Sequence, residues 1–450
     1  MYDSIVIEDR KKPTVTLVNK GFASDTQSAS RGKGMPGLRS IPTTIPCEAS
    51  IMEDIETGVD AAFDDIVAAL TKPLTHEEEA PRPKEAEKPT RIIFKGNLEE
   101  MIRFFYKRGW TDGLPVIPPT EEAVAEMLKG TDLPPDHLLG KLESRMGKAT
   151  VEKIAINAVM AGAVPTYMPV LIAATKLLLE SERGFMGFTT FGFSTGSWAP
   201  FWIINGPVRN EICVNNGSGA LSPGNIANAA IGRAMGLIIK NIGGVRKGVE
   251  DMGVMGNPMK YSMVIAENEE ESPWEPLHVE YGYSAEESTV TVSYPQSYLQ
   301  HWPYGSDGEG ILRSVVDNLP RSMRYTLIFT PTHAKNMARE GWTKEDIKEF
   351  ICEFARMPGS RINRMPPIGT ANPGPYGRKI SIRDTDTVPT VRDPRFIRII
   401  VAGGPGAFIA HVVGGGATPG MKQTQKIEFP KDWDKLVKKH RDLVPTYAKY

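Results

Sequence analysis

Cysteine is scarce in this chain, and the spacing of the few cysteines excludes two kinds of site. The 450 residues contain only Cys47, Cys213 and Cys352, and no CxxC pair occurs. A disulfide framework or a structural zinc site needs closely paired thiols, so we expect neither. Isolated cysteines in a long chain are typical of a reducing compartment, and we therefore expect a cytoplasmic protein.

The chain also lacks an excess of charge and an uninterrupted apolar run. Lysine and arginine number 53 against 54 aspartates and glutamates, a formal net charge of −1. This balance gives no reason to expect a nucleic-acid or membrane partner. The most apolar stretch, residues 154–179, is interrupted by Pro165 and Pro169. It therefore predicts two buried helices joined by a turn, not one membrane-spanning helix.

Strand-like and helix-like patterns alternate along the sequence. Apolar or alternating runs predict strands over residues 14–19, 201–204, 261–266, 288–293, 325–329 and 396–402. Helical spacing predicts helices over residues 51–70, 98–108 and 343–354. This order predicts an α/β fold with mostly parallel or mixed sheets and flanking helices.

A charged, proline-rich stretch divides the chain. Residues 76–89 read HEEEAPRPKEAEKP, which contains no large apolar side chain and predicts a solvated linker over residues 76–91. We therefore expect a small α/β unit over residues 1–75, a central α/β domain over 92–300 and a C-terminal α/β region over 301–450.

A glycine-rich loop follows the predicted strand at 201–204. The loop reaches Ser222, which we expect to cap a helix that begins at Pro223 and ends at residues 243–244. Free backbone N–H groups and the helix dipole meet at such a helix start, so the loop is either an anion site or a tight structural loop. The candidate ligand-binding residues of this region are Asn205, Gly206, Ser222, Gly224, Asn225 and Asn228.

The densest polar cluster, ENEEESPWEPLHVE, occupies residues 267–280 directly after a predicted strand. Ligand groups of α/β sheets lie at such carboxyl ends. Glu267 and His278 are therefore candidate catalytic residues, and together with Glu280 they are candidate ligands of a divalent metal. Residues 269–271 are expected to be a solvated charge run. Trp274 lies in a proline-flanked loop and is a candidate ligand-binding residue.

Other candidates lie outside this cluster. His333 begins a helix after the strand at 325–329, where a catalytic and a capping role are both open. Cys47 precedes the helix at 51–70, whose N-terminus favours a thiolate, so it is the candidate catalytic cysteine. The turn after the strand at 396–402 adds Gly404 and Gly406 as candidate ligand-binding residues.

Taken together, these motifs resemble the UGSC family, named for a Sec-Gly-Ser-Cys or Cys-Gly-Ser-Cys motif. Residues 92–450 are similar to its large domain, and residues 3–75 to the second half of its small domain. The matching segments are GWTDGLPV (109–116), NGP (205–207), PGN (223–225), AN (227–228), AENE (266–269), SPWEP (272–276), HA (333–334) and GW (341–342). The resemblance implies redox or nucleophilic thiol chemistry, as in an oxidoreductase or a lyase.

Three functions remain open on this basis. The first is an enzyme that uses thiol or selenol chemistry on a small, anionic molecule, by reduction or by carbon–heteroatom cleavage. The second is a divalent-metal hydrolase or lyase centred on Glu267, His278 and Glu280. The third is a non-catalytic subunit that docks a thiol-bearing partner through residues 1–75. A divalent metal is the one cofactor that the residues suggest, and the expected assembly is a homo-oligomer.

The motif that gives the family its name is absent, since the sequence contains no CGSC. We therefore expect the reading frame upstream of Met1 to continue, apart from a UGA codon, and to encode one more strand preceded by this motif. The physical reason is that the strand at 14–19 lacks a partner on its N-terminal side, which leaves a sheet edge open. Sequencing the upstream DNA tests this expectation, and an ordinary in-frame stop without the motif contradicts it.

Overall fold

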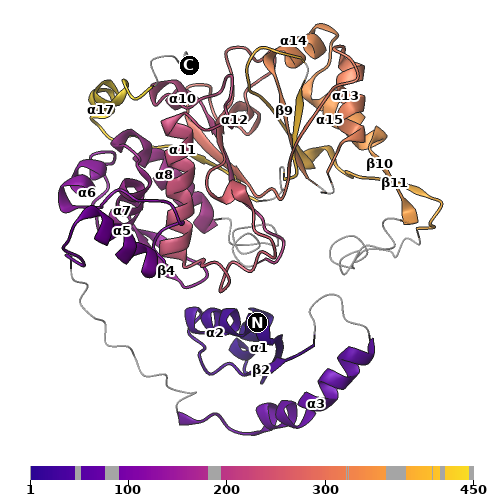
Figure 1. Cartoon of the computed structure of the whole chain (residues 1–450). Coiled ribbons are helices and arrows are strands. Elements are labelled where there is room, and N and C mark those ends of the chain that lie inside the picture. The colour runs from indigo at the N-terminus through magenta and orange to yellow at the C-terminus, as the bar shows by residue number, and fades with distance from the viewer. Residues whose placement is uncertain are drawn as a thin grey trace. The chain divides into compact units, whose positions relative to one another are not determined.

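The computed structural model of the protein describes residues 2–45, 52–76, 91–180, 194–320, 322, 324–360, 382–407, 409–415 and 421–444. Its helices and strands alternate as the sequence predicts for an α/β fold (Figure 1). They form two compact units, the first made of residues 1–171, 178–198 and 233–257 and the second of residues 172–177, 199–232 and 258–450. In these described ranges, no helix is both long and apolar enough to cross a lipid bilayer.

The N-terminal segment, defined as residues 2–76, contains a two-stranded parallel sheet. Its elements are α1 (Tyr2–Asp9), β1 (Thr16–Asn19), η1 (Lys20–Phe22), α2 (Ala23–Gly32), β2 (Ser40–Thr43) and α3 (Met52–Thr71). Thr16 pairs with Ser40 and Asn19 with Thr43. The strand predicted at 14–19 and the helix predicted at 51–70 are thus present. The short, polar α2 was not expected, because its sequence ASDTQSASRG has no apolar periodicity.

The chain then continues through helices and one hairpin. These elements are α5 (Leu98–Lys107), α6 (Glu121–Leu128), β3 (Leu138–Leu142), β4 (Gly147–Thr150), α7 (Val151–Ala161), η2 (Pro165–Tyr167) and α8 (Met168–Glu180). Thr120 caps α6 by accepting a hydrogen bond from Ala123 N. The apolar stretch at 154–179 is, as predicted, two buried helices joined at Pro165.

Two four-stranded sheets build the second unit, and they share one topology. Their strand orders are β14 (Thr424–Lys426)–β7 (Thr289–Ser293)–β5 (Phe201–Asn205)–β6 (Val264–Ala266) and β8 (Tyr298–His301)–β13 (Ala410–Val413)–β9 (Tyr325–Phe329)–β12 (Ile397–Val401). In both sheets the last two strands are parallel and the other neighbours antiparallel.

The first strand of each sheet is exchanged between the two halves of the sequence. β8 follows β7 along the chain but pairs with β13, and β14 follows β13 but pairs with β7. The mixed sheets agree with the predicted fold class. The division predicted between residues 300 and 301 does not coincide with a sheet boundary. It falls within β8, which pairs with β13, and β14 on its C-terminal side pairs with β7 on its N-terminal side.

Apolar side chains on alternate strand positions cover both faces of the second sheet. On one face, Leu327 and Ile399 pack with α13 (Gly308–Asp317), α14 (Pro331–Arg339) and α15 (Lys344–Phe354), which lie together on that side of β9 (Figure 1). On the other face, Ile328 and Ile400 join Ile203 of β5 in a second core between the sheets. Successive side chains of a strand point to opposite faces of its sheet, which places Leu327 and Ile328 in different cores.

Helix α11 (Ile226–Ile238) begins later than predicted. Asn225 is its N-cap, because the side-chain oxygen of Asn225 accepts from Asn228 N at 2.9 Å. The prediction of a cap at Ser222 and a first turn at Pro223 is therefore wrong. The predicted end is confirmed, since a π-helical turn over Ile239–Gly243 stops at Gly244 with a φ of 83°.

Gly232 lets α11 approach the segment before β6. A Cβ added at Gly232 would lie 2.2 Å from Ser262 Oγ and 2.9 Å from Ser262 Cα. We expect Gly232→Ala to reduce the free energy of unfolding by about 1–3 kcal/mol through overpacking, although alanine has the better helix propensity by about 1 kcal/mol. Urea denaturation measures this change. Gly217→Ala is the control, because its nearest atom would lie at 3.6 Å; a more stable Gly232→Ala protein would contradict the close approach.

Candidate functional site

The carboxyl ends of parallel strands from both sheets meet in the second unit. β6 ends at Ala266 and β12 at Val401. Asn268 N donates a hydrogen bond to Val401 O at 2.7 Å, and Glu267 N donates to Ile204 O at 3.2 Å. The residues after β6 therefore lie beside the ends of both β5 and β12.

Three loops selected from the sequence come together at this edge. They are the loop after β5, the acidic segment after β6 and the glycine-rich turn after β12. Gly403 N donates to Asn216 O at 2.8 Å, which links the turn to the loop. A Cβ added at Gly404 would lie 2.8 Å from Ser218 Cβ, so glycine permits this close contact.

Glu267 is a fully buried carboxyl group at the centre of this edge. Its Oε2 atom accepts from Asn205 Nδ2 at 2.6 Å and from Leu277 N at 2.8 Å. Neither Glu267 Oε1 nor Asn205 Oδ1 has a hydrogen-bond partner among the described residues. Burial raises the pKa of Glu267, although Lys344 and the two donors oppose the rise. Burial therefore shifts the protonation equilibrium of Glu267 toward its neutral form.

His278 lies on the same short helix as the amide that binds Glu267. The helix is α12 (Leu277–Glu280), and His278 is fully buried on it. Its Nδ1 atom lies 3.8 Å from Glu269 Oε1, and neither ring nitrogen has a hydrogen-bond partner in the part of the chain that the structure describes. An unpaired buried polar atom costs about 1–3 kcal/mol. Several such atoms in one place are therefore more typical of a functional site than of a packed core.

A buried ion pair that the sequence did not reveal borders Glu267. Arg209 of α10 (Val208–Glu211) donates to Glu269 Oε2 at 3.0 Å and to Glu270 Oε2 at 2.8 Å. The side chains of Arg209 and Glu269 are only 5% and 12% exposed. Glu269 Oε1 also accepts from Gly206 N at 2.7 Å. The hydrogen bond from Arg209 holds the pKa of Glu270 at about 2.

This ion pair corrects the view of residues 269–271 as a solvated charge run for Glu269 alone. The side chain of Glu269 is largely buried because the loop after β5 supplies it with Arg209 and Gly206. Glu270 and Glu271 match the expectation, with their side chains 53% and 52% exposed. The sequence contains one signal that could have identified this ion pair, namely the positions of its two residues. Arg209 follows the end of one apolar strand run, and Glu269 follows the end of the next.

The predicted ligand-binding asparagines of α11 have protein partners for their side chains. Asn228 accepts from Asn215 N at 2.8 Å and donates to the carbonyl oxygens of Asn215, Ala220 and Val264. Asn225 accepts from Asn228 N and donates to Cys213 O at 2.9 Å. These two amides anchor the loop to β6, which is a structural role.

The remaining loop candidates are more dispersed. Ser222 and Gly224 are exposed, and Gly224 has a φ of 129°, which favours glycine. Trp274 donates from Nε1 to Trp342 O at 2.9 Å and packs edge-on against Phe329. Its ring therefore stabilises the core around β9.

His333 is not the cap of its helix, because Thr330 accepts from His333 N and occupies the N-cap position of α14. The ring of His333 is buried, with Nε2 2.7 Å from Ala407 O in the turn that contains Gly406. Gly406 N also donates to Thr332 Oγ1. Burial lowers the pKa of His333, and it lowers that of His411 to about 4. Both imidazoles are neutral at pH 7.

The predicted metal set is not assembled. Glu280 is held by Lys344 at 3.2 Å and by Lys348 at 2.5 Å, so two cations take the place that a metal ion would need beside this carboxylate. Throughout the described ranges, no three His, Cys, Asp or Glu side chains are placed to hold a metal ion. The structure therefore does not support a metal centre on Glu267, His278 and Glu280.

The thiols of the described residues are poorly suited to nucleophilic chemistry. Cys213 and Cys352 are free, and burial raises the pKa of both, that of Cys352 to about 11. The thiolate is the reactive form, so neither residue is an activated nucleophile at pH 7. Cys47, the candidate catalytic cysteine, lies outside the described residues.

Comparison with known proteins gives one match. Residues 1–72 match the model of the UGSC family, which confirms the resemblance for the N-terminal part of the chain. No curated protein and no solved structure was found to match the chain.

The ion pair at this edge makes a prediction about stability. Arg209→Met leaves the carboxylate of Glu269 buried without its cation, and we expect the free energy of unfolding to fall by about 3–5 kcal/mol. Arg103→Met is the matched control, because the Arg103–Glu99 pair is 73% and 74% exposed and should contribute less than about 1 kcal/mol. Urea denaturation measures both variants, and equal losses would show that Glu269 is solvated.

Proposed function

We propose that the chain, whose N-terminal part belongs to the UGSC family, is an enzyme of thiol- or selenol-dependent chemistry. Its substrate is a small, anionic molecule, and the reaction cleaves a carbon–heteroatom bond. The observation that carries the proposal is the buried carboxyl group of Glu267, which is bonded to Asn205 and to the backbone N–H of Leu277, the residue before the buried His278. Polar atoms of Glu267, Asn205 and His278 have no partner in the described residues. The family assignment supports the sulfur or selenium chemistry, and Glu267 supports the acid that such chemistry needs.

Glu267 acts as the general acid in this proposal. Cleavage of a carbon–heteroatom bond places an electron pair on the departing heteroatom, and a positioned acid lowers the barrier by protonating that atom. A carboxyl group serves at neutral pH only if its environment keeps the proton on it. Burial raises the pKa of Glu267 in this direction, whereas Glu270, with its pKa held at about 2, stays ionised.

The proposed step balances in atoms and electrons. The thiolate or selenolate forms a bond to the substrate carbon, and the bond between that carbon and the heteroatom breaks. Its electron pair leaves with the heteroatom, which takes the proton of Glu267. Glu267 then regains a proton from solvent through His278, since an imidazole can accept a proton at one ring nitrogen and donate from the other.

The nucleophile of this step is assigned by elimination among the thiols. Burial raises the pKa of Cys213 and Cys352, so neither supplies a thiolate at neutral pH. The proposal therefore assigns the nucleophile to Cys47 or to a cysteine or selenocysteine of a partner chain.

The variant Glu267→Gln tests the acid without knowledge of the substrate. At pH 7 the unchanged protein should show the infrared C=O band of a buried carboxylic acid, and the variant should lack it. Stability provides a second measurement. Between the unfolded pKa of 4.5 and the raised folded pKa, the native state binds more protons, so the stability of the unchanged protein falls as pH rises through that window. Urea denaturation at several pH values should show a larger fall when Glu267 is present than in Glu267→Gln, because Asp25, whose pKa burial raises to about 6, contributes equally in both proteins.

Glu271→Gln is the control for both measurements. A hydrogen bond from Lys335 lowers the pKa of the exposed Glu271. This variant should therefore keep the infrared band and the fall in stability with rising pH. Absence of the band from the unchanged protein would refute the acid. In a turnover assay with a thiol present, we expect Glu267→Gln and His278→Ala each to lower kcat by about 100-fold.

A further inference from the structure

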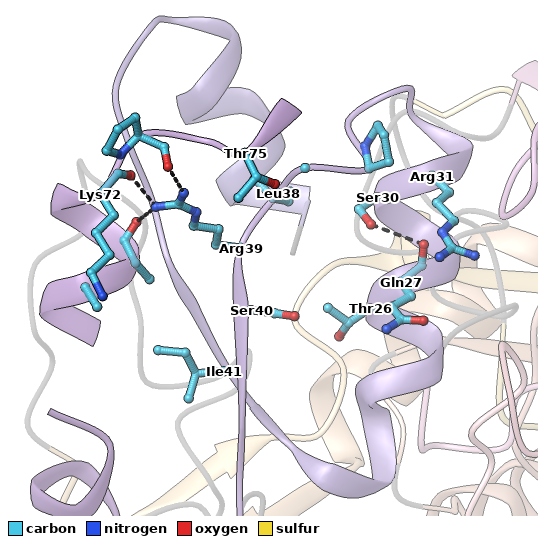
Figure 2. A pocket seen from close by; sticks show the side chains of 15 residues that line it. Thr26, Gln27, Ser30, Arg31, Leu38, Arg39, Ser40, Ile41, Lys72 and Thr75 are labelled. Atoms are coloured by element: carbon cyan, nitrogen blue, oxygen red, sulfur yellow. Dashed lines mark hydrogen bonds between the residues drawn. The ribbon is translucent and has the colours of Figure 1, made fainter. Parts of the chain in front are cut away.

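A cavity of about 480 Å³ lies within the N-terminal segment. Its walls are α2, the residues that lead into β2 and the C-terminal end of α3 (Figure 2). A volume of this size is within the range of pockets that bind small organic molecules. Its described lining residues all belong to residues 26–75, so none of them is part of the loops around Glu267.

The charged side chains among the described lining residues are of one sign. They are Arg31, Arg39 and Lys72, and the described part of the lining contains no aspartate or glutamate. The neighbouring helix α3 carries six acidic and no basic residues, yet none of the six faces the cavity. The segment therefore separates its charges, with the cations at the cavity and the carboxylates elsewhere on α3.

Arg39 binds the helix carbonyl groups that would otherwise repel an anion. The last carbonyl groups of a helix carry partial negative charge. The guanidinium of Arg39 donates to the carbonyl oxygens of Ala69, Lys72 and Pro73 at 2.6–2.7 Å and so caps this end of α3 (Figure 2). Arg31 and Lys72 form no ion pair within the described residues, which leaves both charges available to a ligand.

Hydroxyl groups complete the lining. Figure 2 shows the side chains of Thr26 on α2 and Ser40 on β2 pointing toward one another. Thr26 is 4% exposed, and neither hydroxyl has a hydrogen-bond partner among the described residues, whereas Ser30 donates to Gln27 O. Two free hydroxyls beside two unpaired cations form a suitable set of donors for an oxyanion.

We infer that this cavity binds a small organic anion through its carboxylate or phosphate group. Arg31 and Lys72 supply the charge, Thr26 and Ser40 supply hydrogen bonds, and Arg39 holds the wall formed by α3. The inference goes beyond the proposed function, because it assigns a second ligand site to the segment that matches the UGSC family.

Calorimetric titration of the full chain with inorganic phosphate and with succinate tests this inference. We expect binding of at least one of the two, weakened by added salt because the interaction is between charges. Phosphate binding alone would identify a phosphorylated ligand, and succinate binding alone a carboxylate; both support the site. Uncharged succinamide should not bind. Binding of neither anion, or equal binding of succinamide, would overturn the inference.

Two matched double variants distinguish binding in the cavity from binding to charges elsewhere on the surface. Arg31→Gln with Lys72→Gln should weaken binding at least about 10-fold, since each removes a charge-assisted contact. Arg10→Gln with Lys12→Gln removes the same net charge from the same segment outside the cavity and should leave binding unchanged. Equal weakening by both pairs would mean that the anion sits on the surface, and the inference would be wrong. The titration reads binding, so its outcome is independent of whether Glu267 is an acid.

Discussion

A main-chain hydrogen bond from Asn268 N to Val401 O, 2.7 Å long, joins the carboxyl ends of the two sheets in the second unit. The placement of the loops around Glu267 depends on this junction. The two sheets are also linked by the chain itself, because each is completed by an edge strand from the other half of the sequence. Neither half can pair all its strands alone, since β8 and β14 are exchanged. Groups that leave β5, β6, β9 and β12 are thereby brought to one place.

This junction explains how charged groups remain buried there. Removing carboxylates from water costs several kcal/mol per ion, and only good geometry and additional donors offset that cost. Glu269 has such compensation from Arg209 and Gly206 N. Among the described residues, Glu267 has two donors but no cation in hydrogen-bond contact, and burial raises its pKa. The environments of neighbouring carboxyl groups thus shift their pKa values in opposite directions, upward for Glu267 and downward for Glu270, which is the arrangement that acid–base sites use.

The N-terminal segment is stabilised differently. Two strands bury too little surface to be stable by themselves, so β1 and β2 depend on the helices beside them. Arg39 connects the start of β2 to the end of α3 through three carbonyl groups. The same contacts shape the cavity, so one side chain both holds the helix and leaves the cavity wall without exposed helix carbonyls.

Local sequence determined the elements whose signals lie within a few residues. Apolar runs identified β5, β9 and β12, Gly244 marked the end of a helix, and the polar residues after strands pointed to Asn205 and Glu267. These signals are sufficient because helix caps and strand ends depend on neighbours along the chain.

Only the tertiary structure decided features that depend on residues far apart in sequence. The short strands β8 and β14, YLQH and TQK, have too little pattern to show which sheet they join. Asn225 rather than Ser222 caps α11, because its amide also binds Cys213 O, 12 residues away. Arg209 and Glu269 are 60 residues apart, and Glu280 is held by lysines 64 and 68 residues later. Burial and charge partners are properties of these long-range contacts, so the raised pKa of Glu267 and the loss of the predicted metal site followed from the packing of the sheets.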